Sequence, residues 1–555
     1  MADLFASLPE ALRAAARDRA AAWQKAEGTR RLWAKDATLW TGADESKWLG
    51  WLDVVRAKPA EVALDDKIEH VLVLGMGGSS LCPYVLASTF GPIKGRPRLH
   101  VLDSTDPAQI RAAESAAEPA RSLFIVASKS GSTLEPNILR DYFLDRAGTG
   151  SRFIAITDPG SQLEKQARAD GFRAIVHGVP SIGGRFSALS AFGMVPAGLM
   201  GLDVAKLMGR AATMADACGP ASGPEEKNPG VALGIIMGEA ALHGMDKLTI
   251  VAASAVSELG AWLEQLVAES TGKRGKAIIP VDKEGVRPPE AYGEDRLFVS
   301  LQVKGEADPA HEAAVGALQR AGRPLVRLVL QDRYDLGAEF FRWEIATAVA
   351  GAVMGINAFD QPDVEAAKIE ARRLTDEVEK TGALPPETPI AEDRGIRLFA
   401  DPANAAALAK APRTLEGMLR AHFARLGRGD YFALQAYVDM NEEHEAALQA
   451  LRGTVLGRRR VATTLGFGPR FLHSTGQAHK GGPNTGVFLQ VTCEDARDLP
   501  VPGRRYTFGV VKAAQARGDA AVLAARGRRF LRVHLPPAVP EALRVLGEAV
   551  ERALA

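Results

Sequence analysis

Short apolar runs alternate with amphipathic stretches over most of the chain. In the first part, each apolar run precedes a stretch with the three-to-four-residue spacing of a helix. The runs are His70–Leu74, Leu99–Asp103, Leu123–Ala127 and Phe153–Thr157. Strands that alternate with helices at this spacing predict βαβ units and a parallel sheet.

A second set of such units begins near residue 231. A helix is expected over 231–244, and apolar runs follow at 248–252, 277–281, 297–301 and 325–329, before a long helix over 338–354. This layout predicts a second doubly wound sheet, and its likeness to the first suggests an internal duplication.

The best linker candidate is the proline-rich stretch 382–389. Beyond it lies a third α/β segment. Its strands are expected at 431–438, 460–465, 486–491 and 530–535, and its closing helix at 538–554.

A length of 555 residues is typical of roughly three domains. We predict an α/β protein with two doubly wound parallel-sheet domains and a third C-terminal α/β domain. The predicted boundaries are 1–60 for an N-terminal helical segment, then 61–225, 226–381 and 390–555 for the three α/β domains.

Composition excludes several classes of function. The net charge of +1 offers no electrostatic basis for binding nucleic acid or an anionic membrane. The three cysteines, Cys82, Cys218 and Cys493, are far apart, which argues against zinc clusters and a disulfide framework and favours the cytoplasm. The N-terminus lacks the pattern of a signal peptide, and no apolar stretch is long enough for a membrane span.

The most informative segment is the hydroxyl-rich run Ser128–Thr133, which lies between a predicted strand and a predicted helix. Open N–H groups and the helix dipole favour an anion at such a place, most often a phosphate. The run lacks the Gly-Lys-Ser/Thr ending of a nucleotide P-loop, so it suits a small phosphomonoester. The alternative is an ordinary polar turn.

Four other segments could carry chemistry, and each has an ordinary structural alternative. Gly75–Ser80 joins a strand to a helix but lacks the last glycine of a dinucleotide fingerprint, so it predicts a polar-ligand loop or a tight turn. Arg185 follows two glycines and could hold charge on oxygen, or form a surface salt bridge. Glu269 ends a helix just before a glycine, and Lys368 lies two turns beyond Gln361 on one helical face. The alternatives here are solvated side chains.

The loop 473–482 is rich in glycine and contains His473 and His479. A histidine there could carry a proton near neutral pH. With no cysteine or carboxylate cluster beside it, a general acid or a plain polar loop is favoured over a metal site.

Five of these segments together resemble one family, phosphoglucose isomerase. They are Gly75–Ser79, Ser128–Thr133, Gly183–Ser187, Glu269–Lys273 and Phe359–Lys368, in the family's order. The resemblance covers about residues 65 to 375 and implies two sugar-isomerase-type α/β domains. The whole chain is most similar to the isomerase half of fused transaldolase–isomerase enzymes, with the transaldolase part absent.

The resemblance also implies roles for individual residues. The phosphate would be bound by Ser128, Lys129, Ser130 and Thr133, and the sugar would be lined by Gly78, Ser79 and Gly184. Glu269 would move a proton between C1 and C2, and Arg185 would stabilise the enediolate oxygen. Gln361 would help to bind the phosphate end, and Lys368 would contact the ring oxygen.

The family's ring-opening histidine lies between the glutamate and the glutamine, where this chain has only His311, in what looks like an exposed helix start. The segment Gly476–His479 is closer to the family's Gly-Gln-His pattern, although it lies far downstream. We therefore predict His479 as this group, ahead of His473 and then His311. The third segment could then supply the histidine within one chain, so both a homodimer and a monomer are expected alternatives.

The resemblance implies interconversion of glucose 6-phosphate and fructose 6-phosphate through a cis-enediol(ate), in glycolysis and gluconeogenesis, without metal, nucleotide or redox cofactor. The alternatives are an isomerase for another phosphosugar such as mannose 6-phosphate, a non-catalytic sugar-phosphate sensor, and a dehydrogenase. The expected partner is a small phosphosugar, with a functional association with transaldolase. The predicted location is the cytoplasm.

Overall fold

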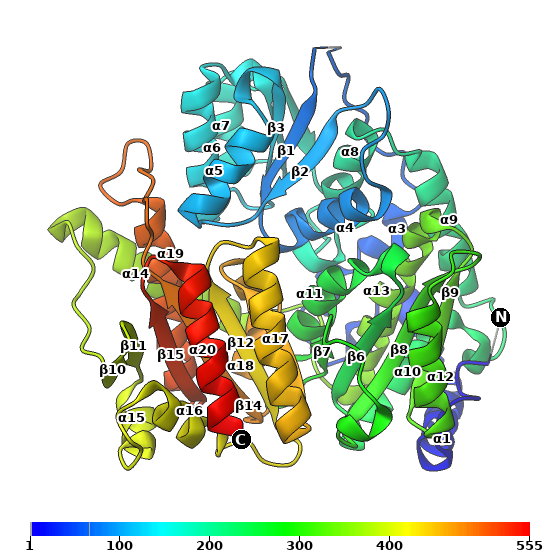
Figure 1. Ribbon diagram of the computed structural model, residues 1–555. Helices are drawn as coiled ribbons and strands as arrows, with labels where there is room; N and C mark the ends of the chain where they lie inside the picture. Colours follow the sequence, from blue (N-terminus) through cyan, green and yellow to red (C-terminus); the bar gives the residue numbers. More distant parts are fainter. Residues whose placement is uncertain (1–2, 66) are drawn as a thin grey trace.

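The computed structural model describes residues 3–65 and 67–555 and contains three β-sheets with helices packed against them (Figure 1). Two sheets are parallel throughout, and the third is antiparallel only along one edge. The predicted α/β fold class is confirmed.

The first sheet has the strand order β2-β1-β3-β4-β5. Its strands are β1 (His70–Gly75), β2 (Arg98–Leu102), β3 (Ser122–Ala127), β4 (Phe153–Thr157) and β5 (Ala174–His177). Its helices are α4 (Leu81–Phe90), α5 (Pro107–Ala116), α6 (Leu134–Ala147), α7 (Gln162–Ala169) and α8 (Ala191–Leu199). Figure 1 shows α5, α6 and α7 on one face of the sheet and α4 and α8 on the other. Because both faces are covered, β1 and β3 are buried and read as continuous apolar runs.

The second sheet has the order β7-β6-β8-β9. Its strands are β6 (Lys247–Ala252), β7 (Ile279–Val281), β8 (Arg296–Val303) and β9 (Leu325–Leu330). Its helices are α9 (Val204–Ala217), α10 (Pro229–Leu242), α11 (Leu259–Thr271), α12 (Pro309–Arg320) and α13 (Leu336–Met354). The four strands, α10 and α13 agree with the predicted elements to within a few residues.

The third sheet has the order β10-β11-β15-β14-β12-β13. Its strands are β10 (Ala391–Asp393), β11 (Ile396–Phe399), β12 (Tyr431–Tyr437), β13 (Ala462–Phe467), β14 (Gly486–Cys493) and β15 (Arg529–Leu535). Its helices are α15 (Pro402–Leu408), α16 (Leu415–Phe423), α17 (Glu442–Arg459), α18 (Gly476–Gly481), α19 (Phe508–Ala525) and α20 (Val539–Leu554).

Two details of the predicted strands were wrong. Strands β5, β10 and β11 were not predicted, because runs of three or four residues are too short to show a clear periodicity. Strand β13 begins at Ala462, two residues later than expected, because Arg460 ends α17 in the left-handed conformation, with φ of 55°.

Several contacts hold together the three units, each of which consists of one sheet and its helices. The N-terminal helices α1 (Glu10–Lys25), α2 (Gly28–Trp33) and α3 (Trp51–Val54) join the second unit, where the indole N–H of Trp40 donates to the carbonyl oxygen of Ala348 at 2.8 Å. Helix α14 (Pro362–Thr381) packs along α19 of the third unit. This packing brings the loop before α18 against the first sheet.

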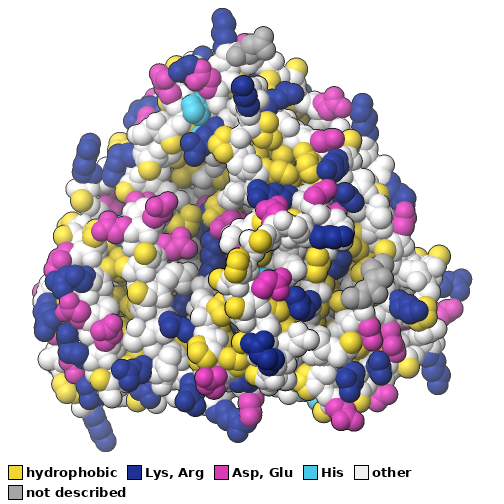
Figure 2. Space-filling view, turned by 45° about the vertical axis from the view of Figure 1, so that its right-hand side comes forward, with side chains coloured by type: hydrophobic (Ala, Val, Ile, Leu, Met, Phe, Trp, Pro, Cys, Tyr) yellow, Lys and Arg dark blue, Asp and Glu magenta, His cyan; other side chains and the backbone are white. Residues whose placement is uncertain are grey.

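The surface carries charges of both signs. On the face shown in Figure 2, acidic and basic side chains are intermixed. Among the described residues, no helix is both long enough and apolar enough to cross a bilayer.

Candidate active site

A cleft of about 470 Å³ lies at the carboxyl ends of β1, β3 and β4. The chain leaves β1 toward β2 and leaves β3 toward β4, on the opposite side of the sheet. Ligands of open α/β sheets bind at such a switch in strand order. The cleft is bordered by the first sheet's loops, by α11, by the start of α14 and by His473 from the third unit.

The hydroxyl-rich loop forms one wall of this cleft. Gly131 adopts φ of 70°, and its N–H donates to the Ser128 hydroxyl at 3.1 Å, which curls the loop. The hydroxyls of Ser130 and Ser132 lie 2.8 Å apart. Thr133 is the N-cap of α6, and its side chain makes no capping hydrogen bond. The first turn of α6 therefore keeps N–H groups that suit an anion.

Lys129 lines the cleft but is already engaged. Its ammonium lies 2.5 Å from Asp158 and donates to the carbonyl oxygen of Pro180 at 3.0 Å. This pairing fastens the hydroxyl-rich loop to the end of β4.

The glycine loops permit a close approach of backbones. A Cβ on Gly78 would lie 1.8 Å from the carbonyl oxygen of Gly184, so the two loops could not touch if residue 78 had a side chain. A Cβ on Gly77, whose φ is 54°, would lie 2.9 Å from the carbonyl oxygen of His473. The glycines therefore bring three distant segments together around the cleft, with Ser79 on its lining.

Arg185 is the central cation of the cleft and is only 2% exposed, so the surface salt bridge considered as its alternative is not observed. Its Nε donates to Ser270 at 2.7 Å and Nη1 to Gln361 at 2.9 Å. Its Nη2 donates to the carbonyl oxygens of Ala358 and Asp360 at 2.7 and 3.0 Å. These four bonds leave one of the five guanidinium N–H groups, on Nη1, for another acceptor.

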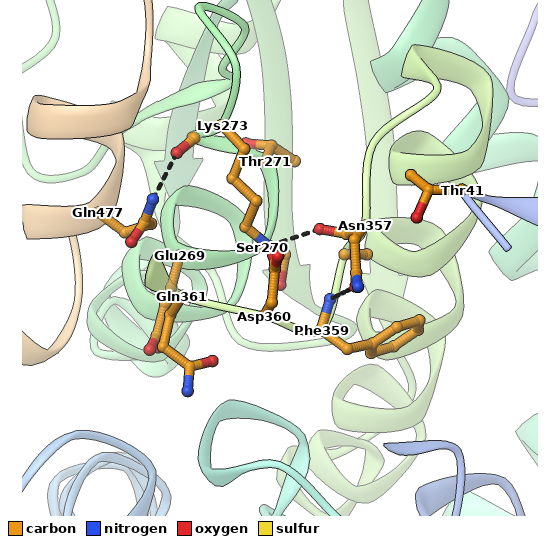
Figure 3. Close-up of polar contacts among 12 residues, drawn as sticks. Thr41, Glu269, Ser270, Thr271, Lys273, Asn357, Phe359, Asp360, Gln361 and Gln477 are labelled. Atoms are coloured by element: carbon orange, nitrogen blue, oxygen red, sulfur yellow. Dashed lines mark hydrogen bonds and ion pairs between the residues drawn. The ribbon is translucent and has the colours of Figure 1, made fainter. Parts of the chain in front are cut away.

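Glu269 lies beside this arginine on the last turn of α11. Its Oε1 is 3.5 Å from Nη1 of Arg185, and its Oε2 accepts from Gln265 at 3.0 Å. The helix ends at Thr271, just before Gly272, as expected. Figure 3 shows the side chains of Glu269 and Gln361 next to each other, and both line the cleft.

Lys273, two residues beyond α11, is a second buried cation behind the cleft. Its ammonium donates to the carbonyl oxygen of Asn357 at 2.6 Å and pairs with Asp360 at 2.9 Å (Figure 3). Burial, reinforced by the Arg185 charge, lowers the pKa of Lys273 to about 7. Lys273 thus supports the backbone that Arg185 also holds.

Helix α14 carries the two remaining predicted residues. Gln361 is its N-cap, and Lys368 lies two turns further on. Both line the cleft, and Lys368 also lines an adjoining hollow of about 550 Å³. The shared helical face predicted for these two residues is observed.

The structure does not bring His479 to the cleft, contrary to our prediction. Its ring is buried among Tyr431, Phe471 and Phe488, and it lines neither hollow. Burial, followed by the nearby Lys480 and Arg528 charges, lowers the pKa of His479 to about 3. The prediction from the sequence pattern was wrong because helix α18 directs the His479 side chain into the core of the third unit.

Acid should destabilise the protein through His479. Its folded pKa of about 3 lies below the usual value of about 6.5, so between these values only the unfolded chain binds the proton. The contribution of His479 to the free energy of unfolding is therefore complete above pH 6.5. It falls by about 1.4 kcal/mol per pH unit as the pH is lowered toward 3. The free energy of unfolding, measured with denaturant, should fall less between pH 6 and pH 4 in His479→Gln than in wild type. Equal losses in both proteins would contradict this assignment.

His311 is also outside the cleft. It starts α12, as predicted, but it is 4% exposed rather than on the surface. Its Nε2 lies 3.1 Å from the hydroxyl of Ser300 and 3.1 Å from the carbonyl oxygen of Val251. Its surroundings are those of a structural histidine in the second unit.

His473 is the histidine that faces the cleft. Its Nε2 lies 2.9 Å from Oε1 of Glu135, and its ring borders both hollows. Arg470, three residues earlier, donates to both carboxylate oxygens of Asp103 at 2.8 and 3.0 Å. This bidentate pair fastens the third unit's loop to the end of β2 and so positions His473.

Glu135 was not predicted as a site residue. Burial raises its pKa, but the His473 ring and Lys368 outweigh this, so the pKa of Glu135 lies below its usual range. Its Oε1 also accepts from Gln515 at 2.7 Å. Its position in the first turn of α6, directly after the hydroxyl-rich loop, is the sequence signal that could have identified it.

Comparisons with known proteins show which family this chain resembles. The phosphoglucose isomerase family model matches residues 51–287. The glucose-6-phosphate isomerase of Rubrobacter xylanophilus is 31% identical over 366 residues, which are 56% of this chain and 83% of that protein. That of Synechococcus sp. (strain JA-3-3Ab) is 31% identical over 349 residues, 54% of this chain and 65% of that protein.

The fold is also found among solved structures. A hypothetical protein from Thermus thermophilus superposes with a TM-score of 0.55 and 24% identity, and the match covers 67% of this chain and 98% of that one.

Together with these relatives, the fold and the cleft indicate an aldose–ketose isomerase built on two parallel α/β sheets. The hydroxyl-rich loop, the buried arginine and the carboxylate come from separate segments and share one cleft. The chain belongs to the phosphoglucose isomerase family. The resemblance seen in the five sequence segments is thereby confirmed.

Proposed function

We propose that this chain interconverts glucose 6-phosphate and fructose 6-phosphate. One observation carries the proposal: Glu269 and the spare N–H of Arg185 face the cleft that the hydroxyl-rich loop borders. A non-catalytic sensor would need the loop but not this carboxylate and arginine together. Formation of fructose 6-phosphate in a coupled assay tests it, and the rate with mannose 6-phosphate separates the two isomerase hypotheses.

In the proposed reaction the phosphate is anchored first. Ser128, Ser130 and Thr133 bind the phosphate together with the open N–H groups of α6, and Lys129 holds their loop in place. Because this binding occurs away from the reacting carbons, its energy orients the sugar. Gly78, Ser79 and Gly184 leave room for the sugar chain, and Gln361 helps to bind the phosphate end through its free amide group.

Ring opening is assigned to His473 rather than His479. His473 donates a proton to the ring oxygen as the bond between C1 and that oxygen breaks, the anomeric hydroxyl releases its proton to solvent and becomes the C1 carbonyl, and Lys368 assists at the ring oxygen. Glu135 is a positioning residue that holds the imidazole through its 2.9 Å contact.

Proton transfer then occurs on the open chain. The Glu269 carboxylate removes the C2 proton as the C1 carbonyl oxygen gains negative charge, which gives a cis-enediol(ate). The remaining N–H of Arg185 stabilises that charge. The proton of the C2 hydroxyl passes to the C1 oxygen, Glu269 returns its proton to C1, and the C2 oxygen becomes the ketone of fructose 6-phosphate.

The two histidines give a matched comparison. His473→Gln should lower kcat by about 10²-fold because ring opening loses its acid. His479→Gln should stay within about threefold of wild type, because general acid catalysis does not involve a ring buried outside the cleft. Exchange of the α and β anomers of glucose 6-phosphate, followed by NMR, isolates the ring-opening step. Slow exchange in His479→Gln with normal exchange in His473→Gln would reverse the assignment.

A single chain supplies every group named above, including the histidine, which favours activity without a second subunit. We therefore propose that the site is complete in a monomer, whether or not the chain also forms a homodimer. Constant activity per chain across a dilution series that dissociates any dimer tests this.

Three broader predictions also stand as proposals. They are the division into domains at 61–225, 226–381 and 390–555, the kinship of the whole chain with the isomerase half of fused transaldolase–isomerase enzymes, and an association with transaldolase. The three free cysteines, two of them buried, favour the cytoplasm as the location. Co-purification with transaldolase from cells that express both proteins tests the association.

A further inference from the structure

The third unit contains a cavity of about 250 Å³ that the isomerase mechanism does not use. It lies at the carboxyl ends of β12, β14 and β15. The chain passes from β12 to β13 on one side and from β14 to β15 on the other. The cavity is thus at the switch in strand order of this sheet, where open α/β sheets bind ligands.

One row of residues across four strands forms its floor. Tyr437, Thr492, His534 and Arg397 are successive register partners on β12, β14, β15 and β11. Residues in one row point to the same face of a sheet. Helix α19 covers the cavity with Lys512 and Arg517, and the linker closes it with Glu387.

Positive charge exceeds negative charge at the centre of this cavity. Arg517 and Arg532 each donate to Oε2 of Glu387 at 2.7 Å, so two guanidinium groups share one carboxylate. Glu387 is the one acidic side chain on the cavity lining. Lys512 and Arg397 also border the cavity, but Asp106, Asp495 and Glu494 already pair with them.

Buried polar groups here lack hydrogen-bond partners. Arg532 is 5% exposed, and its Nε has no partner among the residues that the structure describes. The same holds for the hydroxyl of Tyr437, which is fully buried. Buried donors without partners are costly, so such groups point to a ligand.

The pKa of His534 reflects the same excess of positive charge. Burial, followed by the charges of Arg397 and Arg532, lowers the pKa of His534 to about 4. Its Nδ1 lies 2.8 Å from the Thr492 hydroxyl. A neutral imidazole and a hydroxyl then provide polar contacts beside the two guanidinium groups.

We propose that this cavity is a second anion site, which binds a small phosphomonoester whose phosphate replaces the Glu387 carboxylate between Arg517 and Arg532. Two guanidinium groups match a phosphate dianion better than one carboxylate, because each can donate two parallel hydrogen bonds. Displacement of Glu387 would also remove one contact of the linker 382–389, leaving the hydrogen bond from Arg517 to the carbonyl oxygen of Pro385 at 2.6 Å.

The test separates this site from the active cleft. In the background Ser130→Ala/Thr133→Ala, which weakens the phosphate loop, calorimetric titration with inorganic phosphate and with glycerol 3-phosphate should still detect one equivalent. Adding Glu387→Gln should tighten this binding by about tenfold, because the competing carboxylate loses its charge. Adding Arg532→Gln should weaken it by at least about tenfold. Acetate should bind more weakly than phosphate, and neutral glycerol should not bind.

Arg544→Gln is the matched control, since Arg544 pairs only with exposed carboxylates on α20. It should leave phosphate binding unchanged. The single variants Glu387→Gln and Arg532→Gln should keep wild-type isomerase activity, so failure of the isomerase proposal and failure of this one are distinguishable. Unchanged phosphate affinity in Glu387→Gln would overturn the proposal even if Arg532→Gln failed to fold, as would absence of binding in the Ser130→Ala/Thr133→Ala background.

Discussion

Replacement of Glu269 by glutamine is expected to lower kcat by about 10⁴-fold, with KM changed by less than about fivefold. Glutamine keeps the shape of the side chain and an oxygen that can accept from Gln265, so substrate binding is retained. It has no carboxylate to take the C2 proton. Its amide group also leaves Arg185 without the ion pair at 3.5 Å, which the substrate's oxygen can partly replace.

Proton exchange gives the sharpest measurement of this effect. In deuterated water, wild type should place deuterium at C2 of glucose 6-phosphate, and Glu269→Gln should not. Glu264→Gln is the matched control on the same helix, outside the cleft. Burial and the neighbouring Asp282 carboxylate raise the pKa of Glu264, so the neutral amide is a close substitute. Exchange at the wild-type rate in Glu269→Gln would assign the base to another residue.

Substitution of Arg185 by lysine is expected to lower kcat by about 10³-fold, although the charge is conserved. An ammonium has three donors on one atom, so it cannot reach Ser270, Gln361 and two backbone carbonyl oxygens together. The acceptors left behind are buried. The free energy of unfolding should therefore fall by about 3 kcal/mol.

The measurement combines steady-state kinetics with denaturant unfolding. Arg210→Lys is a suitable control, because Arg210 also binds carboxylates, Asp332 and Asp335, but is 38% exposed. It should change kcat by less than about twofold and stability by less than about 1 kcal/mol. If Arg185→Lys retained more than a tenth of wild-type kcat, a single point charge would suffice and the guanidinium geometry would be unimportant.

Much of the fold follows from local patterns in the chain. The buried strands β1, β3, β4, β6 and β8 read as apolar runs because helices cover both faces of their sheets. Proline and glycine mark the ends of α14, which runs from Pro362 to just before Gly382. Strands β5, β10 and β11, of three or four residues each, escaped prediction because so few side chains define no period.

Part of the candidate site could also be predicted from local patterns in the chain. The hydroxyl-rich loop, Glu269 and Gln361 were recognisable because each lies where a helix begins or ends. Arg185 was recognisable from the two glycines before it, and Lys368 from its helical spacing to Gln361. All of these residues line one cleft. Their joint presence in the chain is enough to indicate a phosphosugar site.

The histidine proposed for ring opening could not be identified from the sequence. His473 and His479 lie on one short segment, and no local pattern separates them. Packing of α14 on α19 and the pair between Arg470 and Asp103 turn His473 toward the cleft and leave His479 in an aromatic core. Residue types and short-range periodicity thus specify strands, helices and the phosphate loop. Contacts between residues hundreds of positions apart select the histidine and its partner Glu135, because the direction of a side chain depends on what packs against it.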